Sequence, residues 1–447
     1  MQSDTICALA TATGGAIGMI RISGSKAIEC TDKIFHANSG TLLKDAHANT
    51  LHYGTITDRD GTIIDEVIVS VFRAPHSYTG EDSVEISCHG SSYILKKVIE
   101  TLLDNGCRQA SAGEYTKRAF LNGKMDLSQA EAVADLIAST NKATHDIALS
   151  QLKGNFSTEL KVLREQLLKI SSLIELELDF SEEDVTFADR QQLLTLSEKI
   201  KQRISTLLHS FELGKVLKEG IPVAIVGKTN VGKSTLLNRL LHDDKAIVSN
   251  IHGTTRDSIE DTTIINGVCF RFIDTAGLRK TTDEVEAIGI ERTYQKIAQA
   301  RIILWVVDTM PTQAEKEEIQ TLTRGKTLIE IFNKADKDHP ATAEAIAISA
   351  KYDNDLSQLE TAIFEAADIH DINEEDVIVT NARHYDALSR AHDDIIKVIR
   401  GLKENLSGDL LAEDLRHCTH TLAEITGGEI QSTDILNNIF SHFCIGK

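Results

Sequence analysis

The sequence predicts a multidomain chain of combined α+β and α/β class, in which a doubly wound α/β domain is inserted into a helical domain. Residues 1–120 mix short apolar strands with amphipathic helices, as an α+β domain does. Residues 218–372 alternate strand and helix patterns, which is typical of a mostly parallel sheet. The stretches on either side of that domain, 121–217 and 373–447, have helical periodicity. The last stretch cannot easily bury a core of its own, so we expect its helices to pack on the earlier ones as one discontinuous domain.

In the N-terminal domain, apolar runs indicate strands that alternate with helices. Two polar segments, 74–82 and 113–124, look like loops that carry aromatic and charged side chains. Such loops often line binding sites, although ordinary solvated turns would have the same composition. The expected strands are 5–10, 18–22, 64–72 and 84–87, and the expected helices are 26–35 and 92–105.

The helical domain is expected to contain long helices, because proline is absent and glycine is sparse in its first half. The region 127–152 has the pattern of one helix or of two. The other expected helices are 156–178 and 191–217 before the insertion, and 384–402, 410–425 and 433–440 after it.

Composition narrows the class of protein. The 47 basic and 67 acidic residues leave a formal net charge of −20, so any contact with RNA must be local or supplied by a partner. The 7 cysteines are scattered and include no Cys-x-x-Cys, which favours a reducing compartment and therefore a cytoplasmic protein. We expect neither a secretory signal nor a membrane-spanning segment, because the N-terminus lacks a basic region and no apolar run is long enough.

The inserted domain opens with a phosphate-binding loop. A β-branched apolar run at 223–226 leads into Gly227-x-x-x-x-Gly232-Lys233-Ser234, and an apolar-periodic helix follows. Strand, glycine loop and helix are the context that this motif requires, because the loop amides and the helix N-terminus face the phosphates. We expect Lys233 to reach the outer phosphates and Ser234 to bind Mg²⁺.

Four further motifs follow in the order that a GTPase requires. Gly253–Asp257 offers a threonine for Mg²⁺ and the γ-phosphate, and Asp274–Gly277 offers an aspartate and a glycine amide on the same side. Asn333–Asp336 ends in a carboxylate that accepts from guanine N1 and its exocyclic amine, which adenine cannot satisfy. Ser349–Lys351 would cover the base. The strands expected to carry these loops are 222–226, 262–273, 301–307, 327–332 and 345–348.

One residue that many GTPases use is missing. Leu278 stands where small GTPases commonly place a water-orienting glutamine. Hydrolysis then needs another group to orient water and another positive charge at the transition state. The candidates for the charge are Arg256, Arg279 and a bound monovalent cation, and the candidates for orienting water are Asp283, Glu284 and Glu286.

From end to end, the chain resembles the MnmE (TrmE) family of tRNA-modification GTPases. The resemblance is carried by Ser77-Tyr-Thr-Gly-Glu-Asp82, Cys88-His-Gly90 and Arg118-Ala-Phe-Leu-Asn-Gly-Lys124, together with the motifs above. It is also carried by the terminal sequence Phe440-Ser-His-Phe-Cys444-Ile-Gly-Lys447. The chain departs from the usual family pattern at Thr229, where a proline is common, and this difference concerns the stiffness of the loop.

The resemblance implies an N-terminal domain that binds 5,10-methylene- or 5-formyl-tetrahydrofolate and forms a homodimer. It implies that a K⁺ ion replaces the arginine finger and that Glu286 orients water. By position, Arg21, Glu85, Lys124 and Lys447 would contact the folate, Asn230, Ser249, Ile251 and Thr254 would bind K⁺, and Ser234 and Thr255 would bind Mg²⁺. The residues expected to contact GTP are Asn230, Val231, Gly232, Lys233, Ser234, Thr235, Ser249, Thr254, Thr255, Asp274, Gly277, Asn333, Lys334, Asp336, Ser349, Ala350 and Lys351.

The resemblance also implies partners and a reaction. An FAD-dependent protein, MnmG, would join the homodimer in a heterotetramer. Together they would attach an aminomethyl or carboxymethylaminomethyl group to C5 of the wobble uridine of tRNA. The expected catalytic residues are Glu286, Lys233 and Cys444, although Cys444 could equally be a tail thiol with a structural role. The alternative is a regulatory or ribosome-assembly GTPase that performs no one-carbon chemistry.

Overall fold

The structure is a computed structural model, and two compact units make up the chain. The described residues are 4–179, 190–242, 261–273, 295, 297–337, 345–352, 356–369, 377–428, 433–441, 443, 444 and 446. One unit comprises Met1–Ile137, Gln151–Ser197 and Asp393–Lys447, and the other comprises Ala138–Ser150 and Glu198–His392. Among the described residues, no helix has both the length and the apolar character needed to cross a membrane.

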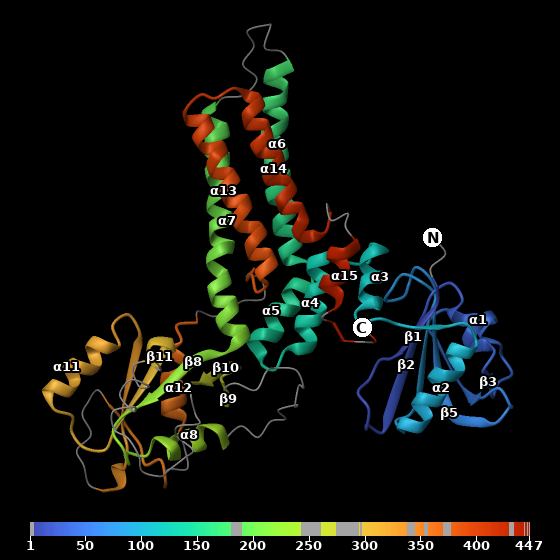
Figure 1. Ribbon diagram of the computed structural model, residues 1–447, viewed down its shortest axis with the longest axis horizontal. Helices are drawn as coiled ribbons and strands as arrows, with labels where there is room; N and C mark the ends of the chain where they lie inside the picture. Colours follow the sequence, from blue (N-terminus) through green and yellow to red (C-terminus); the bar gives the residue numbers. More distant parts are fainter. Residues whose placement is uncertain are drawn as a thin grey trace. The chain divides into compact units, whose positions relative to one another are not determined.

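The first unit contains a seven-stranded sheet in the order β3-β4-β5-β6-β2-β1-β7 (Figure 1). Neighbouring strands are antiparallel, except for the parallel pair β1 and β7. The helices α1 (Ala27–Asp32) and α2 (Ser92–Asp104) cover one face, where Ile20, Val69 and Ile86 are fully buried. The strands are β1 (Ile6–Leu9), β2 (Ile17–Ser23), β3 (Phe35–Ala37), β4 (Thr50–Thr57), β5 (Ile63–Phe72), β6 (Ser83–His89) and β7 (Arg108–Gln109), with a 3-10 turn η1 (Leu43–Asp45).

The expectation of a polar loop at 113–124 is wrong, because α3 (Glu114–Leu121) occupies most of it. Gly113 enters the helix with a φ of 63°, a left-handed conformation that glycine adopts at little cost. Tyr115 and Ala119 lie one turn apart, and both are fully buried. The polar residues Thr116 and Arg118 of this helix are buried as well, so they pack within the protein and are not the solvated residues of a loop. The other segment, 74–82, is a loop as expected.

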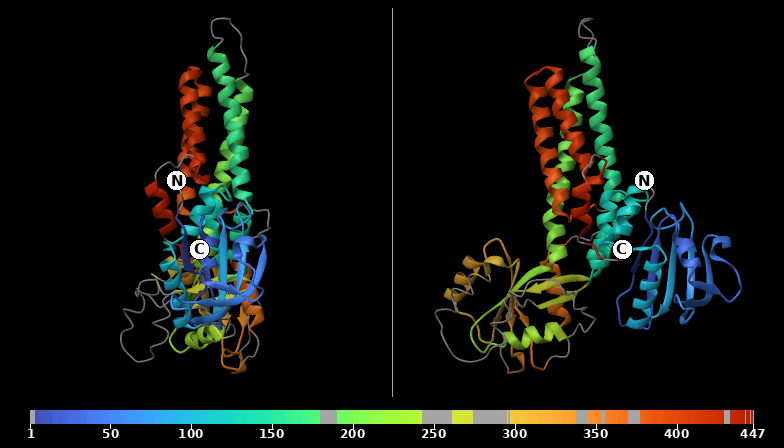
Figure 2. Two further views of the ribbon diagram at one scale, coloured as in Figure 1. Left: turned by 90° about the vertical axis from the view of Figure 1, so that its right-hand side faces the viewer. Right: turned by 45° about the vertical axis from the view of Figure 1, so that its right-hand side comes forward.

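The helical part confirms that a helix from the end of the chain packs on an earlier one. Helix α14 (Gly408–Thr426) lies along α6 (Asn155–Asp179), as both views of Figure 2 show. The contact is close at Gly408, where a Cβ atom would lie 3.1 Å from side-chain carbons of Ile174 and Leu178. The remaining helices are α4 (Leu127–Ala138), α5 (Lys142–Leu152), α7 (Arg190–Glu219), α13 (Ala382–Lys403) and α15 (Thr433–Ser441).

The segment 127–152 forms two helices, α4 and α5, rather than one. The side chain of Asn141 accepts a hydrogen bond of 3.0 Å from the backbone N–H of Thr144. This is a helix cap, which satisfies an amide at the start of α5. Helix α5 and the end of α7 contribute Ile147 and Leu217 to the core beneath the second sheet.

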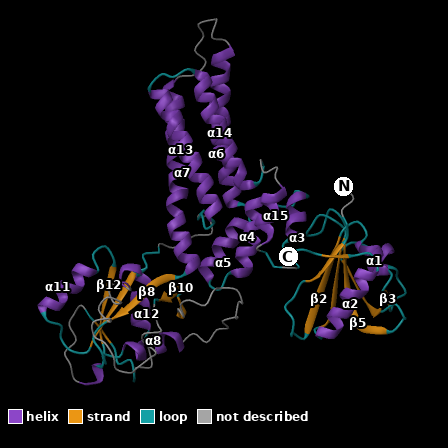
Figure 3. Cartoon of the chain, viewed as in Figure 1, coloured by secondary structure: helices purple, strands orange, loops and turns teal. Residues whose placement is uncertain are grey.

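The second unit contains a six-stranded sheet in the order β13-β12-β11-β8-β10-β9 (Figure 3). All its pairs are parallel except β9 with β10. Apolar clusters lie against both faces, as expected for a doubly wound sheet. The strands are β8 (Ile221–Val226), β9 (Asp261–Ile265), β10 (Val268–Phe272), β11 (Ile302–Val307), β12 (Thr327–Phe332) and β13 (Ile346–Ala347). The helices are α8 (Lys233–His242), α11 (Gln313–Leu322) and α12 (Ser357–Ala366), with a 3-10 turn η3 (Ala335–Lys337).

The single strand expected over 262–273 is wrong, because the segment is the hairpin of β9 and β10. Asn266 and Gly267 form its turn with φ values of 49° and 80°. An Asn-Gly pair is the preferred two-residue turn, because both residues tolerate positive φ. The Asn-Gly turn signal is present in the sequence, but the apolar residues on both sides of it have the pattern of one continuous strand.

Candidate functional site

The glycine loop lies between β8 and α8, as the motif predicts. Gly227, Asn230 and Gly232 have φ values of 146°, 63° and 101°. A Cβ atom on Gly227 would lie 2.2 Å from the carbonyl oxygen of Val306, and one on Gly232 would lie 2.1 Å from Nδ2 of Asn333. The loop thus needs glycine both for its backbone conformation and for its close approach to β11 and to Asn333.

Asn333 joins the phosphate loop to the loop expected to cover the base. Its side chain is buried, with Nδ2 donating to the Val231 carbonyl oxygen at 2.7 Å. Its Oδ1 accepts from the backbone N–H of Ala350 at 2.9 Å. One amide therefore connects three motifs that are distant in the sequence, and it fixes the spacing between the phosphate and base sides of the site.

Lys334 and Asp336 project from the same turn. The Nζ of Lys334 donates to the Asn230 carbonyl oxygen at 2.8 Å and to Oδ2 of Asp308 at 2.7 Å. The Oδ1 of Asp336 accepts from the hydroxyl of Ser349 at 2.6 Å. A carboxylate held by a hydroxyl in this way is oriented to accept from a ligand with adjacent N–H groups, as guanine has.

Lys233 begins α8 and lies over the loop. Its Nζ donates to the carbonyl oxygens of Gly227 and Lys228 at 2.7 and 2.5 Å. The positive end of the α8 dipole and the ammonium group thus lie at the same loop, where they favour a bound anion. Ser234 follows in the first turn of α8, and its hydroxyl is a hard oxygen donor of the kind that Mg²⁺ prefers.

Several expected site residues lie outside the described part of the chain. They are Ser249, Ile251, Thr254, Thr255, Arg256, Asp274, Gly277, Arg279, Asp283, Glu284, Glu286 and Lys447. Among the residues that the structure does describe, no cluster of three histidine, cysteine or acidic side chains could hold a metal ion. Sequence reasoning missed Asp308, although its place directly after a buried strand of the sheet was a usable signal.

A second candidate site surrounds Arg21 in the N-terminal unit. Arg21 and Glu85 are cross-strand partners on β2 and β6, and their side chains form an ion pair of 2.8 Å with exposures of 18% and 20%. The guanidinium lies 5.6 Å from the ring centre of Tyr78 and 5.8 Å from that of Tyr115. The aromatic rings and the carboxylate together hold the guanidinium in place.

The C-terminal tail reaches this second site. Arg21 donates to the Gly446 carbonyl oxygen at 3.3 Å, and the Gly113 N–H donates to the Cys444 carbonyl oxygen at 3.3 Å. Cys444 is exposed. The structure therefore brings Arg21, Glu85 and the tail together. Lys124 donates instead to the Pro75 carbonyl oxygen at 3.0 Å, on the loop that carries Tyr78.

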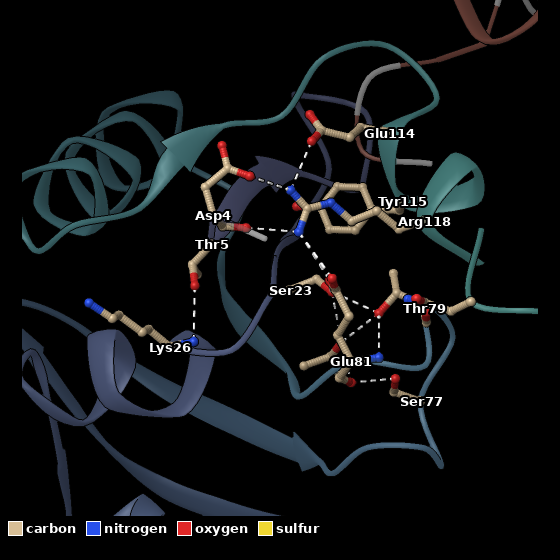
Figure 4. Close-up of polar contacts among 12 residues, drawn as sticks. Asp4, Thr5, Ser23, Lys26, Ser77, Thr79, Glu81, Glu114, Tyr115 and Arg118 are labelled. Carbon is tan, nitrogen blue, oxygen red and sulfur yellow. Dashed lines mark hydrogen bonds and ion pairs between the residues drawn. The ribbon is translucent and has the colours of Figure 1, made fainter. Parts of the chain in front are cut away.

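A charged network around Arg118 supports that loop (Figure 4). The Arg118 guanidinium pairs with Asp4, Glu81 and Glu114 at 2.9, 3.1 and 2.9 Å. Glu81 also accepts from Ser23 at 2.9 Å. The motif residues of 77–82 thus bond largely to the protein itself, and they anchor the loop to α3 and β2.

Glu114 shows how strongly this network favours its charged form. Burial by itself raises the pKa of Glu114, but hydrogen bonds from Arg108, Ser111 and Arg118 outweigh it. Their combined effect lowers the pKa of Glu114 to about 2. Burial likewise raises the pKa of Tyr115, whose hydroxyl donates to the Arg21 carbonyl oxygen at 2.6 Å.

Comparison with known proteins finds matches along the whole chain. The family profile of the MnmE helical domain matches residues 127–444, and that of the GTP-binding protein TrmE N-terminus matches residues 5–124. The tRNA modification GTPase MnmE of Bacteroides thetaiotaomicron is 55% identical over 100% of both chains. The proteins of the same name from Christiangramia forsetii and Flavobacterium johnsoniae are 50% and 49% identical, over 100% of this chain and 99% and 100% of theirs.

Proposed function

Because the chain belongs to the MnmE family of tRNA modification GTPases, we propose that it is a potassium-stimulated GTPase that modifies the wobble uridine of tRNA. In this proposal it works with a flavoprotein partner of the MnmG type and a one-carbon tetrahydrofolate, and it installs an aminomethyl or carboxymethylaminomethyl group on C5. The observation that carries the proposal is the interlocked nucleotide site, at Asn333, in a chain that matches the family over its full length. Since tRNA is the proposed substrate, the proposed place of action is the cytoplasm.

In the GTPase reaction, the described residues hold the nucleotide. Lys233 and the loop amides bind the phosphates, and Asp336 selects guanine. Ser234 and, outside the described residues, Thr255 would hold Mg²⁺, which would supply positive charge to the phosphate oxygens. Outside the described part, Thr254, Asp274 and Gly277 are proposed to contact the γ-phosphate side, and Glu286 is proposed to orient the attacking water.

Asn230 supports the potassium part of the proposal. It lies exposed at the apex of the phosphate loop, with its backbone in the left-handed region. Its amide oxygen is a neutral hard donor, which suits an alkali cation, and the missing glutamine at Leu278 leaves a need for such a charge. Ser249, Ile251 and Thr254 would complete the ligand set.

Turnover of GTP in K⁺ and Na⁺ at equal ionic strength tests the potassium proposal. We expect hydrolysis to be about tenfold or more faster in K⁺, because the ion takes the role of an arginine finger. Asn230→Ala should remove this difference, and Asn437→Ala, in the other unit, should retain it. Equal rates in the two salts would contradict the potassium proposal and leave GTP hydrolysis itself intact.

The geometry around Arg21 supports a folate site. A guanidinium and a carboxylate beside two aromatic rings suit the carboxylates, donors and flat ring of a folate. The exposed Cys444 lies on the same tail as Gly446, and in this proposal its thiol acts on a carbon bound there. A bound folate would supply the one-carbon unit, and Lys124 and Lys447 would add positive charge.

Calorimetric titration of 5-formyltetrahydrofolate into the intact protein tests the folate proposal. We expect binding, and we expect Arg21→Ala to weaken it about tenfold or more, because a charge-assisted hydrogen bond is lost. Arg59→Ala is the control, since Arg59 pairs with Asp104 at the exposed surface of the same domain. No heat of binding to the intact protein would favour the alternative, a regulatory or ribosome-assembly GTPase.

The proposed homodimer is supported by an apolar face on the N-terminal sheet. On the side away from α2, Leu51, Tyr53 and Ile68 are 70%, 52% and 46% exposed, and Tyr53 pairs with Ile68 across β4 and β5. Arg21 and Glu85 continue this face along β2 and β6. Covering it with a second copy would bury the apolar residues beside the proposed folate site. The flavoprotein would then bind the dimer as a heterotetramer.

Sedimentation of the Tyr53→Lys, Ile68→Glu double variant tests the dimer. We expect the wild type to sediment as a dimer and the variant as a monomer, because two charges would be buried in the interface. A double variant that remains dimeric would place the interface elsewhere.

Cys444→Ser separates the two activities. We expect it to spare GTP hydrolysis and to abolish tRNA modification in the presence of the partner. Loss of GTP hydrolysis would show instead that the tail is structural for the nucleotide domain.

A further inference from the structure

Asp308 stands next to the nucleotide site without belonging to any of its motifs. It directly follows β11, the strand between β8 and β12, at the edge of the sheet where the site loops emerge. Its Oδ2 lies 2.7 Å from the Nζ of Lys334, and the exposed fractions of the two side chains are 27% and 33%. The pair is therefore mostly shielded from water, which strengthens the attraction between its charges.

The same ammonium group holds the apex of the phosphate loop. The Nζ of Lys334 donates to the Asn230 carbonyl oxygen at 2.8 Å. Asn230 and Lys334 have φ values of 63° and 65°, so both residues occupy the left-handed region that non-glycine residues rarely adopt. Such conformations persist only where surrounding contacts impose them, and the lysine bond is one of those contacts.

A lysine side chain does not by itself hold a fixed position. It has four rotatable bonds, and its ammonium group can point in many directions. The carboxylate of Asp308, directly after the neighbouring strand β11, restricts the ammonium group to the direction in which it meets Asn230. The adjacent Asn333 holds Val231 in a similar way but needs no such restriction, because its short amide is buried and bonded at both ends.

We propose that Asp308 is a positioning residue of the nucleotide site, which acts through Lys334 to hold the apex of the phosphate loop in its binding conformation. It does not contact the nucleotide. Its removal leaves Lys334 free to swing toward solvent or toward the phosphates, so the loop loses the contact at Asn230. The consequence is weaker binding of guanine nucleotides.

Titration of a fluorescent GDP analogue into the full chain tests this role. We expect Asp308→Asn to weaken binding about five- to tenfold, since one charge-assisted bond is lost. Asp308→Glu should restore most of the affinity. Glu318→Gln is the matched control, because it removes the same charge from an exposed position on α11. Thermal melting of each variant checks that it is folded.

A double-mutant cycle separates positioning from a general effect on the fold. If Asp308 acts through Lys334, the Asp308→Asn, Lys334→Gln double variant binds GDP no more weakly than Lys334→Gln alone. The KM for GTP should rise in Asp308→Asn while kcat changes little, because the carboxylate does not touch the reacting atoms. Wild-type affinity in Asp308→Asn, or effects of the two substitutions that multiply, would overturn the proposal.

Discussion

Each of the two units contains a polar side chain that joins distant segments, but the two side chains have different roles. Arg118 ties the N-terminus, the 77–82 loop and α3 together through three carboxylates. Asn333 ties the phosphate loop to the base-covering loop through two backbone groups. The Arg118 contacts are all within the protein and serve the fold. The Asn333 contacts fix the spacing between the phosphate loop and the loop expected to cover the base.

The difference affects how motifs rich in polar residues should be interpreted. Both networks arise from short sequence patterns that looked equally functional. The role of each network depends on which groups its side chains bond to. Charges that pair with each other stabilise the fold, whereas a neutral amide that fixes the distance between two loops positions the residues of a binding site. The following changes test that distinction, from the largest expected effect to the smallest.

Replacement of Arg118 should damage the fold most. Arg118→Met removes the ion pairs of Arg118 with Glu81 and Glu114, both largely buried, while Glu114 keeps its pair with Arg108, and we expect the free energy of unfolding to fall by about 3–5 kcal/mol. Denaturant unfolding followed by circular dichroism measures this loss. Arg59→Met, whose partner Asp104 is at the surface, should cost less than about 1 kcal/mol. An equal loss of stability in the two variants would show that the Arg118 network stabilises the fold no more than an exposed ion pair does.

Replacement of Asn333 should damage binding. Asn333→Ala leaves the Val231 carbonyl and the Ala350 N–H without this partner, and we expect GDP affinity to fall roughly 30- to 100-fold, or about 2–3 kcal/mol. Asn122 makes a similar bond of 2.7 Å to the Thr79 carbonyl oxygen in the N-terminal unit. Asn122→Ala should leave GDP affinity unchanged. A comparable loss in both variants would mean that the effect reflects general destabilisation.

Acid should weaken the Arg118 network through Glu114. Its pKa is about 2 in the folded chain against an ordinary value of 4.5, so the folded state binds fewer protons. The stabilisation is therefore complete above about pH 4.5 and is lost as the pH falls toward 2. We expect Glu114→Gln to be less stable than wild type at pH 6 by on the order of 2 kcal/mol, with the difference vanishing near pH 2. A difference that does not depend on pH would argue against the ion pairs as its source.

The smallest expected effect concerns a contact in the second unit that lies outside the candidate nucleotide site and contributes to stability. Gly267, in the β9–β10 turn, has a φ of 80°, and a Cβ atom there would lie 3.0 Å from the Cβ of Lys142 on α5. Gly325 has a φ of 79° but no atom within 4 Å of that position. We expect Gly325→Ala to cost about 1 kcal/mol through backbone strain and Gly267→Ala slightly more, through strain and contact together. Thermal unfolding of both variants measures the difference in stability. Equal losses would show that α5 moves to accommodate the added methyl group at no measurable cost.

The sequence by itself determined the parts that depend on near neighbours. Short apolar runs predicted β8, β11 and β12, and the glycine loop was predicted between the correct strand and helix. The Asn333–Asp336 turn, which the sequence predicts to recognise guanine, likewise follows the end of its strand. These signals are local, because periodicity and turn chemistry depend on residues a few positions apart.

Only the tertiary structure decided which distant groups meet. Arg21 and Gly446 are 425 positions apart, and no spacing rule predicts that the tail would lie at β2. The same holds for Asp308 beside Lys334, and for α3, whose polar residues resembled a loop in the sequence although Thr116 and Arg118 are buried in the fold. The physical reason is that burial and ion pairing depend on the path of the whole chain. A sequence pattern reports only what a segment prefers before it meets its neighbours.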